Sequence, residues 1–226
     1  MTQSTSSITD FSRTVFRVGR RRTAMYFMLC AGIASFAVHD GAPGPLSNLA
    51  IDSTAGASFL SREISSVFAR FDAKMLKLQR AQTVTAFARR YAVNSRLALD
   101  IHDAAERAGI DPDLAFRLVK LESDFDEQAT SPVGAIGLTQ LMLATAQEYD
   151  ESLTSEMLYE RQLNLRLGFR YLRDMLEEHD GHIMLALAAY NRGPGTVSKL
   201  LAQGQVPSNA YERVIMRGYT GRGILE

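Results

Sequence analysis

The spacing of apolar residues constrains the fold of this chain more than any other feature. From residue 59 onward apolar side chains recur at intervals of three and four, beginning with Leu60, Ile64 and Val67. This spacing places them on one face of an amphipathic helix. No stretch alternates apolar and polar residues long enough to predict a sheet. The sequence therefore predicts an all-α fold.

Helix boundaries can be predicted from capping residues. The first apolar pattern covers 59–92, which we interpret as a pair of packing helices. Asn94 is a candidate N-cap for the next helix, and Asp111-Pro112 provides an N-cap followed by proline at the first helical position. That helix is expected to end near Glu122. Further helices are predicted at 137–149, 162–179, 183–191, 194–203 and 208–218.

The composition excludes several classes of function. The 226 residues include 25 Lys+Arg and 25 Asp+Glu, so the formal net charge of zero does not indicate nucleic-acid binding. A single cysteine, Cys30, excludes a disulfide framework and a cysteine-based zinc site. The chain also lacks the H-E-x-x-H, G-x-G-x-x-G and P-loop motifs. We therefore expect a protein without cofactor, either an enzyme or a binding protein.

The N-terminal region has the pattern of an export segment. Arg20-Arg21-Arg22 precedes residues 23–38, which carry no charge and are mostly apolar. We interpret 1–38 as a signal peptide or an N-terminal membrane anchor, and this is the only membrane contact that we expect. Residues 39–58 are rich in Gly, Pro, Ser and Ala and are predicted to be a flexible linker. The expected location is the periplasm or cell envelope.

Glu122 is the strongest candidate for a catalytic residue. Leu114, Leu118 and Glu122 are spaced by four and therefore lie on the same helix face. A carboxyl group at the end of an apolar stripe is expected to have a raised pKa, which would keep it protonated near neutral pH. A protonated glutamic acid can act as a general acid. By spacing alone, however, a glutamate at a helix end is more often a solvated or hydrogen-bonded residue.

Three motifs follow in order along the chain. Glu122-Ser123 comes first, then S-P-V-G-A-x-G-L-x-Q-L-M over 131–142, then A-Y-N-x-G-P-G over 189–195. In this order and spacing the motifs resemble the catalytic domain of soluble, Slt-like lytic transglycosylases. The resemblance covers about 95–218 and implies a lysozyme-like helical domain of the goose type. We assign this domain to 94–226 and describe 59–93 as a helical extension.

The resemblance implies a role for each candidate residue. Glu122 would be the catalytic acid and base. The residues grouped with the substrate site are Ser123, Gln140, Tyr190, Asn191 and Tyr211. Ser123 would satisfy a backbone group at the helix end, and Gln140 would bind sugar hydroxyl or acetamido groups. Tyr190 and Asn191 would line the subsite next to the cleaved bond, with a ring for stacking and an amide for hydrogen bonds. Tyr211, on the last helix, would point toward Glu122 and steady it.

This sequence departs from the family pattern at several positions. The family usually has Glu-Thr shortly before its last tyrosine, whereas Pro207-Ser208-Asn209 precedes Tyr211 here, which leaves Tyr219 as the alternative tyrosine. Thr139 stands where Met is usual, and we expect it to put a small polar group in the groove. Leu143 stands where Pro is usual.

The resemblance also implies the reaction and the partners. The substrate would be peptidoglycan, cleaved between N-acetylmuramic acid and N-acetylglucosamine without water, and no metal or cofactor is expected. Asp124, Asp126 and Glu127 are expected to form a solvated loop. A hydrolytic muramidase and a noncatalytic peptidoglycan-binding or scaffold protein are the alternatives. The helical extension would brace the domain or dock on a secretion, conjugation or flagellar assembly.

Overall fold

The computed structural model describes residues 53–225, with side chains from residue 62 onward. The predicted signal or anchor at 1–38 and most of the predicted linker lie outside this range. Between residues 53 and 225 no helix combines the length and the hydropathy that a bilayer span requires. The chain divides into two compact units, Met1–Ser65 and Ser66–Glu226, and apart from the start of the first helix the features described below lie in the second.

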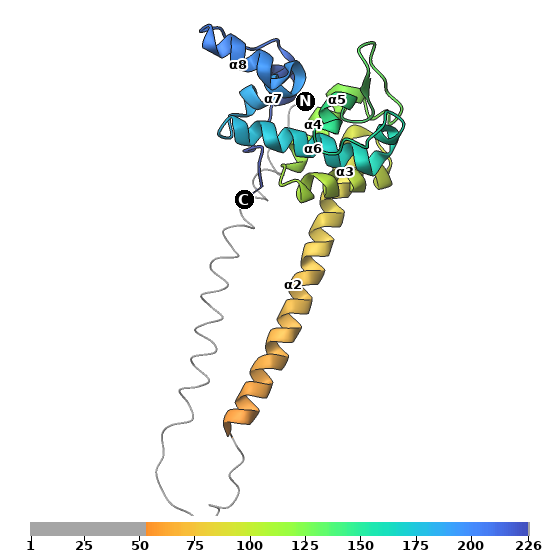
Figure 1. Cartoon of the computed structure of the whole chain (residues 1–226). Helices are drawn as coiled ribbons and strands as arrows, with labels where there is room; N and C mark the ends of the chain where they lie inside the picture. Colours follow the sequence, from red (N-terminus) through yellow and green to blue (C-terminus); the bar gives the residue numbers. More distant parts are fainter. Residues whose placement is uncertain (1–52, 226) are drawn as a thin grey trace, which may run out of the picture. The chain divides into compact units, whose positions relative to one another are not determined.

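The helical extension is one continuous helix, α2 (Ser53–Tyr91), coloured orange to yellow in Figure 1. The prediction of a helix pair is therefore wrong, because no turn interrupts the helical backbone. The helix also begins inside the stretch predicted as linker. Val84 and Ala88 are buried near its end, whereas Phe71 and Leu78 are more than half exposed.

Seven further α-helices follow in the described part of the second unit and confirm the all-α prediction. They are α3 (Ser95–Arg107), α4 (Pro112–Ser123), α5 (Leu143–Gln147), α6 (Arg161–Glu178), α7 (Ile183–Arg192), α8 (Pro194–Ala202) and α9 (Tyr211–Met216). A short 3-10 helix, η1 (Met157–Tyr159), precedes α6. The predicted cap is present at Asn94, whose side chain accepts a hydrogen bond from Leu97 N at 2.8 Å.

Helix α6 lies at the centre of the domain and packs against α3 and α7 (Figure 1). Its buried face includes Leu165, Phe169, Leu172 and Leu176. Where α2 ends, the Phe87 ring stacks on Phe116 of α4 with centroids 4.4 Å apart. This packing attaches the C-terminal end of α2 to the domain.

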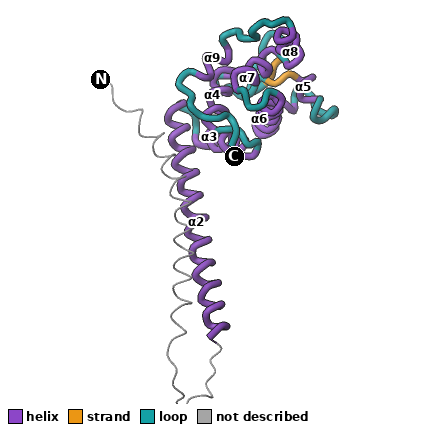
Figure 2. The backbone as a smooth tube through the Cα atoms, turned by 90° about the vertical axis from the view of Figure 1, so that its left-hand side faces the viewer, coloured by secondary structure: helices purple, strands orange, loops and turns teal. Residues whose placement is uncertain are grey.

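The predicted helix over 137–149 is wrong. The chain instead forms a small antiparallel hairpin of β1 (Ala135–Ile136) and β2 (Leu141–Met142), drawn in orange in Figure 2, and only 143–147 is helical. Gly137 and Gln140 have positive φ angles of 74° and 47°, which a right-handed helix does not allow. The spacing of apolar residues in this stretch is that of a helix, but the turn at Gly137 and Gln140 gives the backbone a hairpin conformation instead.

Candidate active site

Glu122 lies in the last turn of α4. Asp111 caps the start of this helix by accepting a hydrogen bond from Asp113 N at 2.9 Å, and Pro112 occupies its first position. The helix ends because Asp124 has a left-handed conformation with φ of 53°. Leu114 and Leu118, on the same face as Glu122, are fully buried, so the carboxyl group continues a face that packs into the core.

A tyrosine from the far end of the domain contacts this carboxyl group. The Tyr211 hydroxyl, at the start of α9, donates a hydrogen bond to Glu122 Oε1. Burial raises the pKa of Glu122 to about 7, against the opposing effect of the Tyr211 hydrogen bond. No other carboxylate contributes to this shift among the described residues. Glu122 can therefore be protonated near neutral pH and can also exist as the base.

Asn209 connects Tyr211 with Asn191. Its Oδ1 accepts a hydrogen bond from Tyr211 N at 3.2 Å, and its Nδ2 donates to Asn191 Oδ1 at 2.8 Å. Asn191 lies near the end of α7 and is exposed. The hydrogen bond from Asn209 fixes the orientation of the Asn191 amide, and its nitrogen can donate to a ligand.

Tyr190 interacts electrostatically with Glu122 but does not offer a free ring. The side chain is 8% exposed, its ring packs at a tilt on Tyr171 with centroids 5.1 Å apart, and its hydroxyl donates to Thr139 O at 2.9 Å. Burial raises the pKa of Tyr190 well above its ordinary value, and the charge of Glu122 raises it further. Tyr190 thus lies close enough to Glu122 for electrostatic interaction, although its ring is covered.

Ser123 and Gln140 hold the hairpin loop. The Ser123 hydroxyl donates to Leu138 O at 2.9 Å and to Val119 O at 3.2 Å, which joins the end of α4 to the hairpin. The Gln140 amide nitrogen donates to Ala129 O at 3.2 Å and Gly137 O at 3.0 Å. Both side chains thus bind backbone carbonyls.

The same loop is fixed to α6 by a buried asparagine. Asn164, 1% exposed, accepts from Thr139 N at 2.9 Å and donates to Ile136 O and Leu158 O, each at 2.9 Å. Thr139 itself is fully buried, and its hydroxyl donates to Asn164 Oδ1 at 2.8 Å. The expectation that Thr139 lines the groove is therefore wrong, because this hydrogen bond turns its side chain inward.

Residues 100–211 match the family model of the transglycosylase SLT domain. This part of the chain is an SLT domain. The finding confirms the resemblance that the sequence motifs indicated, and the matched region includes Glu122, the hairpin and Tyr211.

Named relatives of the SLT domain are considerably longer proteins. The soluble lytic murein transglycosylase of Salmonella typhimurium is 31% identical over 117 residues, covering 46% of this chain and 18% of the relative. The membrane-bound lytic murein transglycosylase F of Desulfosudis oleivorans is 35% identical over 103 residues, covering 43% of this chain and 22% of the relative. The chain therefore matches about a fifth of the length of each. A solved structure of an inactive mutant of lytic transglycosylase Slt from Pseudomonas aeruginosa shares 30% identity, with a TM-score of 0.44 over 50% of this chain and 21% of that one.

The acids that follow Glu122 in the SLT domain have partners of their own. Asp124 is exposed and pairs with Lys120, and Asp126 accepts a hydrogen bond from Gln128 N at 2.9 Å. Glu127 accepts from Arg161 at 2.6 Å. The prediction of a solvated loop thus holds for the exposed Asp124 and Asp126, but Glu127 is held in an ion pair that links the loop to α6.

Two features of the SLT domain did not emerge from the sequence. Glu212, beside Tyr211, is 1% exposed and accepts a hydrogen bond from Ser208, while its Oε2 is buried without a partner. Asn209 joins two candidate site residues, as described above. The only sequence hint of either feature was that Pro207-Ser208-Asn209 replaces the Glu-Thr pair usual before the last tyrosine. That difference does not indicate what the replacing residues bind. Tyr219, the alternative to Tyr211, donates to Asp111 at the opposite end of α4.

Proposed function

We propose that this protein is a peptidoglycan lytic transglycosylase in which Glu122 acts first as acid and then as base. The observation that supports this most directly is the pKa of Glu122, which burial raises to about 7 within an SLT domain. The names of the relatives, lytic murein transglycosylases, support peptidoglycan as the substrate.

In the first step Glu122 gives its proton to the glycosidic oxygen between N-acetylmuramic acid and N-acetylglucosamine. Tyr211 occupies Oε1 of Glu122, so Oε2 would carry the proton to the sugar. The acetamido oxygen of the muramic acid stabilises the positive charge at C1 while the bond from C1 to the leaving oxygen breaks. A single carboxyl group suffices when the substrate supplies this assistance.

In the second step the Glu122 carboxylate takes a proton from the C6 hydroxyl of the same sugar. The C6 oxygen then bonds to C1, and the product is a 1,6-anhydro end. The net change moves one proton from the C6 oxygen to the leaving oxygen and consumes no water. The Tyr211 hydrogen bond favours the ionised form of Glu122, which is the form that this step needs.

The remaining candidates would position the glycan. The Asn191 amide nitrogen would donate to a sugar or acetamido oxygen, because its own oxygen is engaged by Asn209. Gln140 would accept from a sugar hydroxyl through its amide oxygen, because its nitrogen binds loop carbonyls. Ser123 and Tyr190 would not contact the glycan; their hydroxyls would hold the hairpin loop through Leu138 O and Thr139 O. We expect no cofactor or metal in the reaction, and docking of the extension on an envelope assembly stays a prediction.

The test is digestion of purified peptidoglycan by the full chain, with the products identified by mass spectrometry. Wild type should release anhydro-muropeptides, which are one water lighter than hydrolytic products, and Glu122→Gln should release none. Products with hydrated ends would identify a muramidase instead. Binding to peptidoglycan without cleavage by either protein would support the scaffold alternative.

A further inference from the structure

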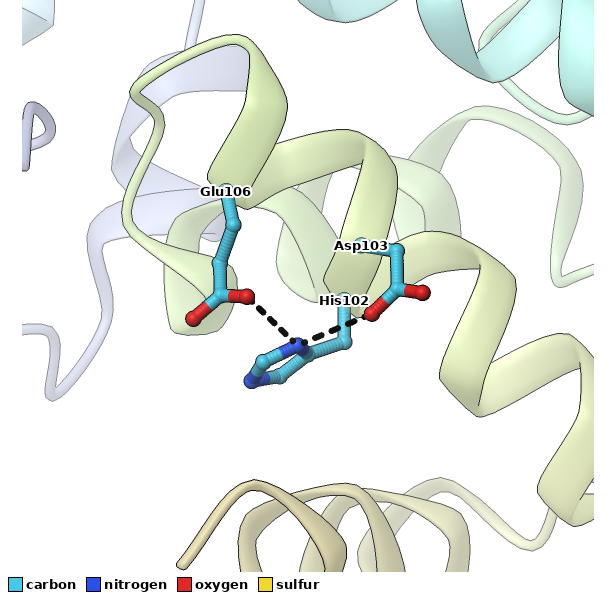
Figure 3. Close-up of side chains that lie close together, drawn as sticks. All are labelled: His102, Asp103 and Glu106. Atoms are coloured by element: carbon cyan, nitrogen blue, oxygen red, sulfur yellow. Dashed lines mark ion pairs between the residues drawn. The ribbon is translucent and has the colours of Figure 1, made fainter. Parts of the chain in front are cut away.

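Three potential metal ligands lie together on α3, at a site distinct from Glu122. His102, Asp103 and Glu106 each offer one ligand atom, and these three atoms lie within 4.8 Å of one another. Figure 3 shows the two carboxyl groups converging on the Nδ1 atom of the His102 ring. We call these three residues the His102 cluster.

The buried imidazole of this cluster lacks a hydrogen-bond partner. His102 is 3% exposed, and its Nδ1 atom is buried without a hydrogen bond. The two nearest carboxylate oxygens are at 3.6 Å in Asp103 and 3.5 Å in Glu106. Hydrogen bonds from nitrogen to oxygen are about 2.7–3.2 Å long. The two contacts are thus long ion pairs, and the buried Nδ1 atom has no short polar partner among the described residues. A buried polar atom without a hydrogen bond calls for an explanation.

The two distances from Nδ1 are longer than hydrogen bonds and close to the spacing of ligand atoms around a metal ion. Tetrahedral zinc has bonds of about 2.0–2.2 Å to nitrogen and oxygen, which places neighbouring ligand atoms roughly 3.4 Å apart. The Nδ1 atom of His102 therefore lies close to the ligand separation from both carboxylates. An imidazole with two carboxylates, completed by water, is a ligand set that zinc accepts.

Asp103 is held in position by a residue of the long helix. Arg80 of α2 donates to both carboxylate oxygens of Asp103, at 2.9 Å from its Nε to Oδ1. Burial acts to raise the pKa of Asp103, but the hydrogen bond and charge of Arg80 together hold it below its ordinary value. The carboxylate is thus ionised and oriented, as ligands supported by an outer partner commonly are.

We propose that the His102 cluster binds a divalent transition-metal ion of the zinc type through His102 Nδ1 and one oxygen each from Asp103 and Glu106. Because Arg80 holds Asp103, the bound ion would strengthen the junction between α2 and α3. The inference is independent of the reaction proposed at Glu122.

The experiment is calorimetric titration of the metal-stripped full chain with Zn²⁺, and in parallel with Mg²⁺. One Zn²⁺ should bind per chain, and Mg²⁺ should bind far more weakly because it prefers oxygen ligands alone. Glu106→Gln should weaken zinc binding about tenfold or more, and His102→Gln should abolish it. Should His102→Gln fail to fold, Glu106→Gln decides alone, since its side chain is 49% exposed and tolerates the change.

Two matched variants control for zinc bound elsewhere. Glu177→Gln removes an acid whose side chain is 58% exposed, and His182→Gln removes an exposed imidazole. Both should bind zinc as wild type does. The proposal is overturned if zinc does not bind, if Glu106→Gln binds as tightly as wild type, or if magnesium binds equally well.

Discussion

Glu122 and Glu127 lie close together in the sequence, yet their surroundings differ. Glu122 accepts a hydrogen bond from the neutral Tyr211 hydroxyl, whereas Glu127 accepts from the guanidinium of Arg161. Arg161 also binds Asp100 at 2.9 Å, and together the two carboxylates raise its pKa. A partly buried carboxyl beside a neutral donor can exchange a proton near pH 7, whereas one beside a cation serves as an ion-pair partner. The difference arises because α9 brings Tyr211 to Glu122, whereas the start of α6 brings Arg161 to Glu127.

The largest effect that we expect is on activity. Glu122→Gln should lower the rate of glycan cleavage by about a thousandfold or more, because a general acid and base of this kind contributes roughly 10²–10⁴. Glu127→Gln should keep the rate within a few-fold of wild type. The measurement is the rate at which each variant releases anhydro ends from peptidoglycan, under the same conditions as wild type. Equal losses would show that Glu122 has no special role.

The second effect is on stability and depends on pH. The pKa of Glu122 is raised from 4.5 to about 7 in the folded state, so its protonation stabilises the fold below pH 4.5 and this contribution is lost as the pH rises to 7. Glu122→Gln should therefore be more stable than wild type at pH 8, by on the order of 2 kcal/mol, and the difference should shrink at pH 5.

Urea unfolding at the two pH values measures this difference. The control is Glu127→Gln, which removes an ion pair and is expected to destabilise the protein by about 1 kcal/mol or less. A wild type more stable than Glu122→Gln at pH 8 would contradict the raised pKa.

The third effect tests whether Tyr211 tunes the pKa of Glu122 or has a purely structural role. Tyr211→Phe removes the hydrogen bond that lowers the pKa of Glu122, so that pKa should rise above 7. The alkaline limb of the kcat/KM profile should move to higher pH, and the maximal rate should fall about tenfold as Glu122 loses its orientation. An unchanged limb with a lower rate would indicate that the hydroxyl acts only on packing.

The smallest effect concerns Asn209. Asn209→Ala removes the partner of Asn191, and we expect KM for soluble glycan strands to rise about fivefold with little change in kcat, since one hydrogen bond contributes about 1 kcal/mol. Asn209→Asp keeps an acceptor for Tyr211 N but loses the donor to Asn191. The aspartate variant should therefore show the same raised KM as the alanine variant. A KM equal to that of wild type would disprove the role of Asn209 in positioning Asn191.

Much of the fold could be predicted from local sequence signals. The cap at Asn94 and the Asp111-Pro112 start are both present, because capping depends on neighbouring residues alone. The hairpin over 135–142 could not be predicted from apolar spacing, because its conformation depends on positive φ angles and on Asn164 from α6. A Cβ atom at Gly168 would lie 2.2 Å from the Thr139 hydroxyl, so the approach of the hairpin to α6 also requires a glycine there.

The sequence by itself determined the all-α class, the order of the motifs and the position of Glu122 at the end of an apolar helix face. Only the tertiary structure decided that Tyr211 rather than Tyr219 contacts Glu122, that Tyr190 and Thr139 turn inward, and that Glu127 pairs with Arg161. The physical reason is the sequence separation over which each interaction acts. Helix formation and capping involve residues within four positions of one another, whereas burial and hydrogen bonding at Glu122 depend on a tyrosine 89 positions away that only the packing of α9 on α4 brings near.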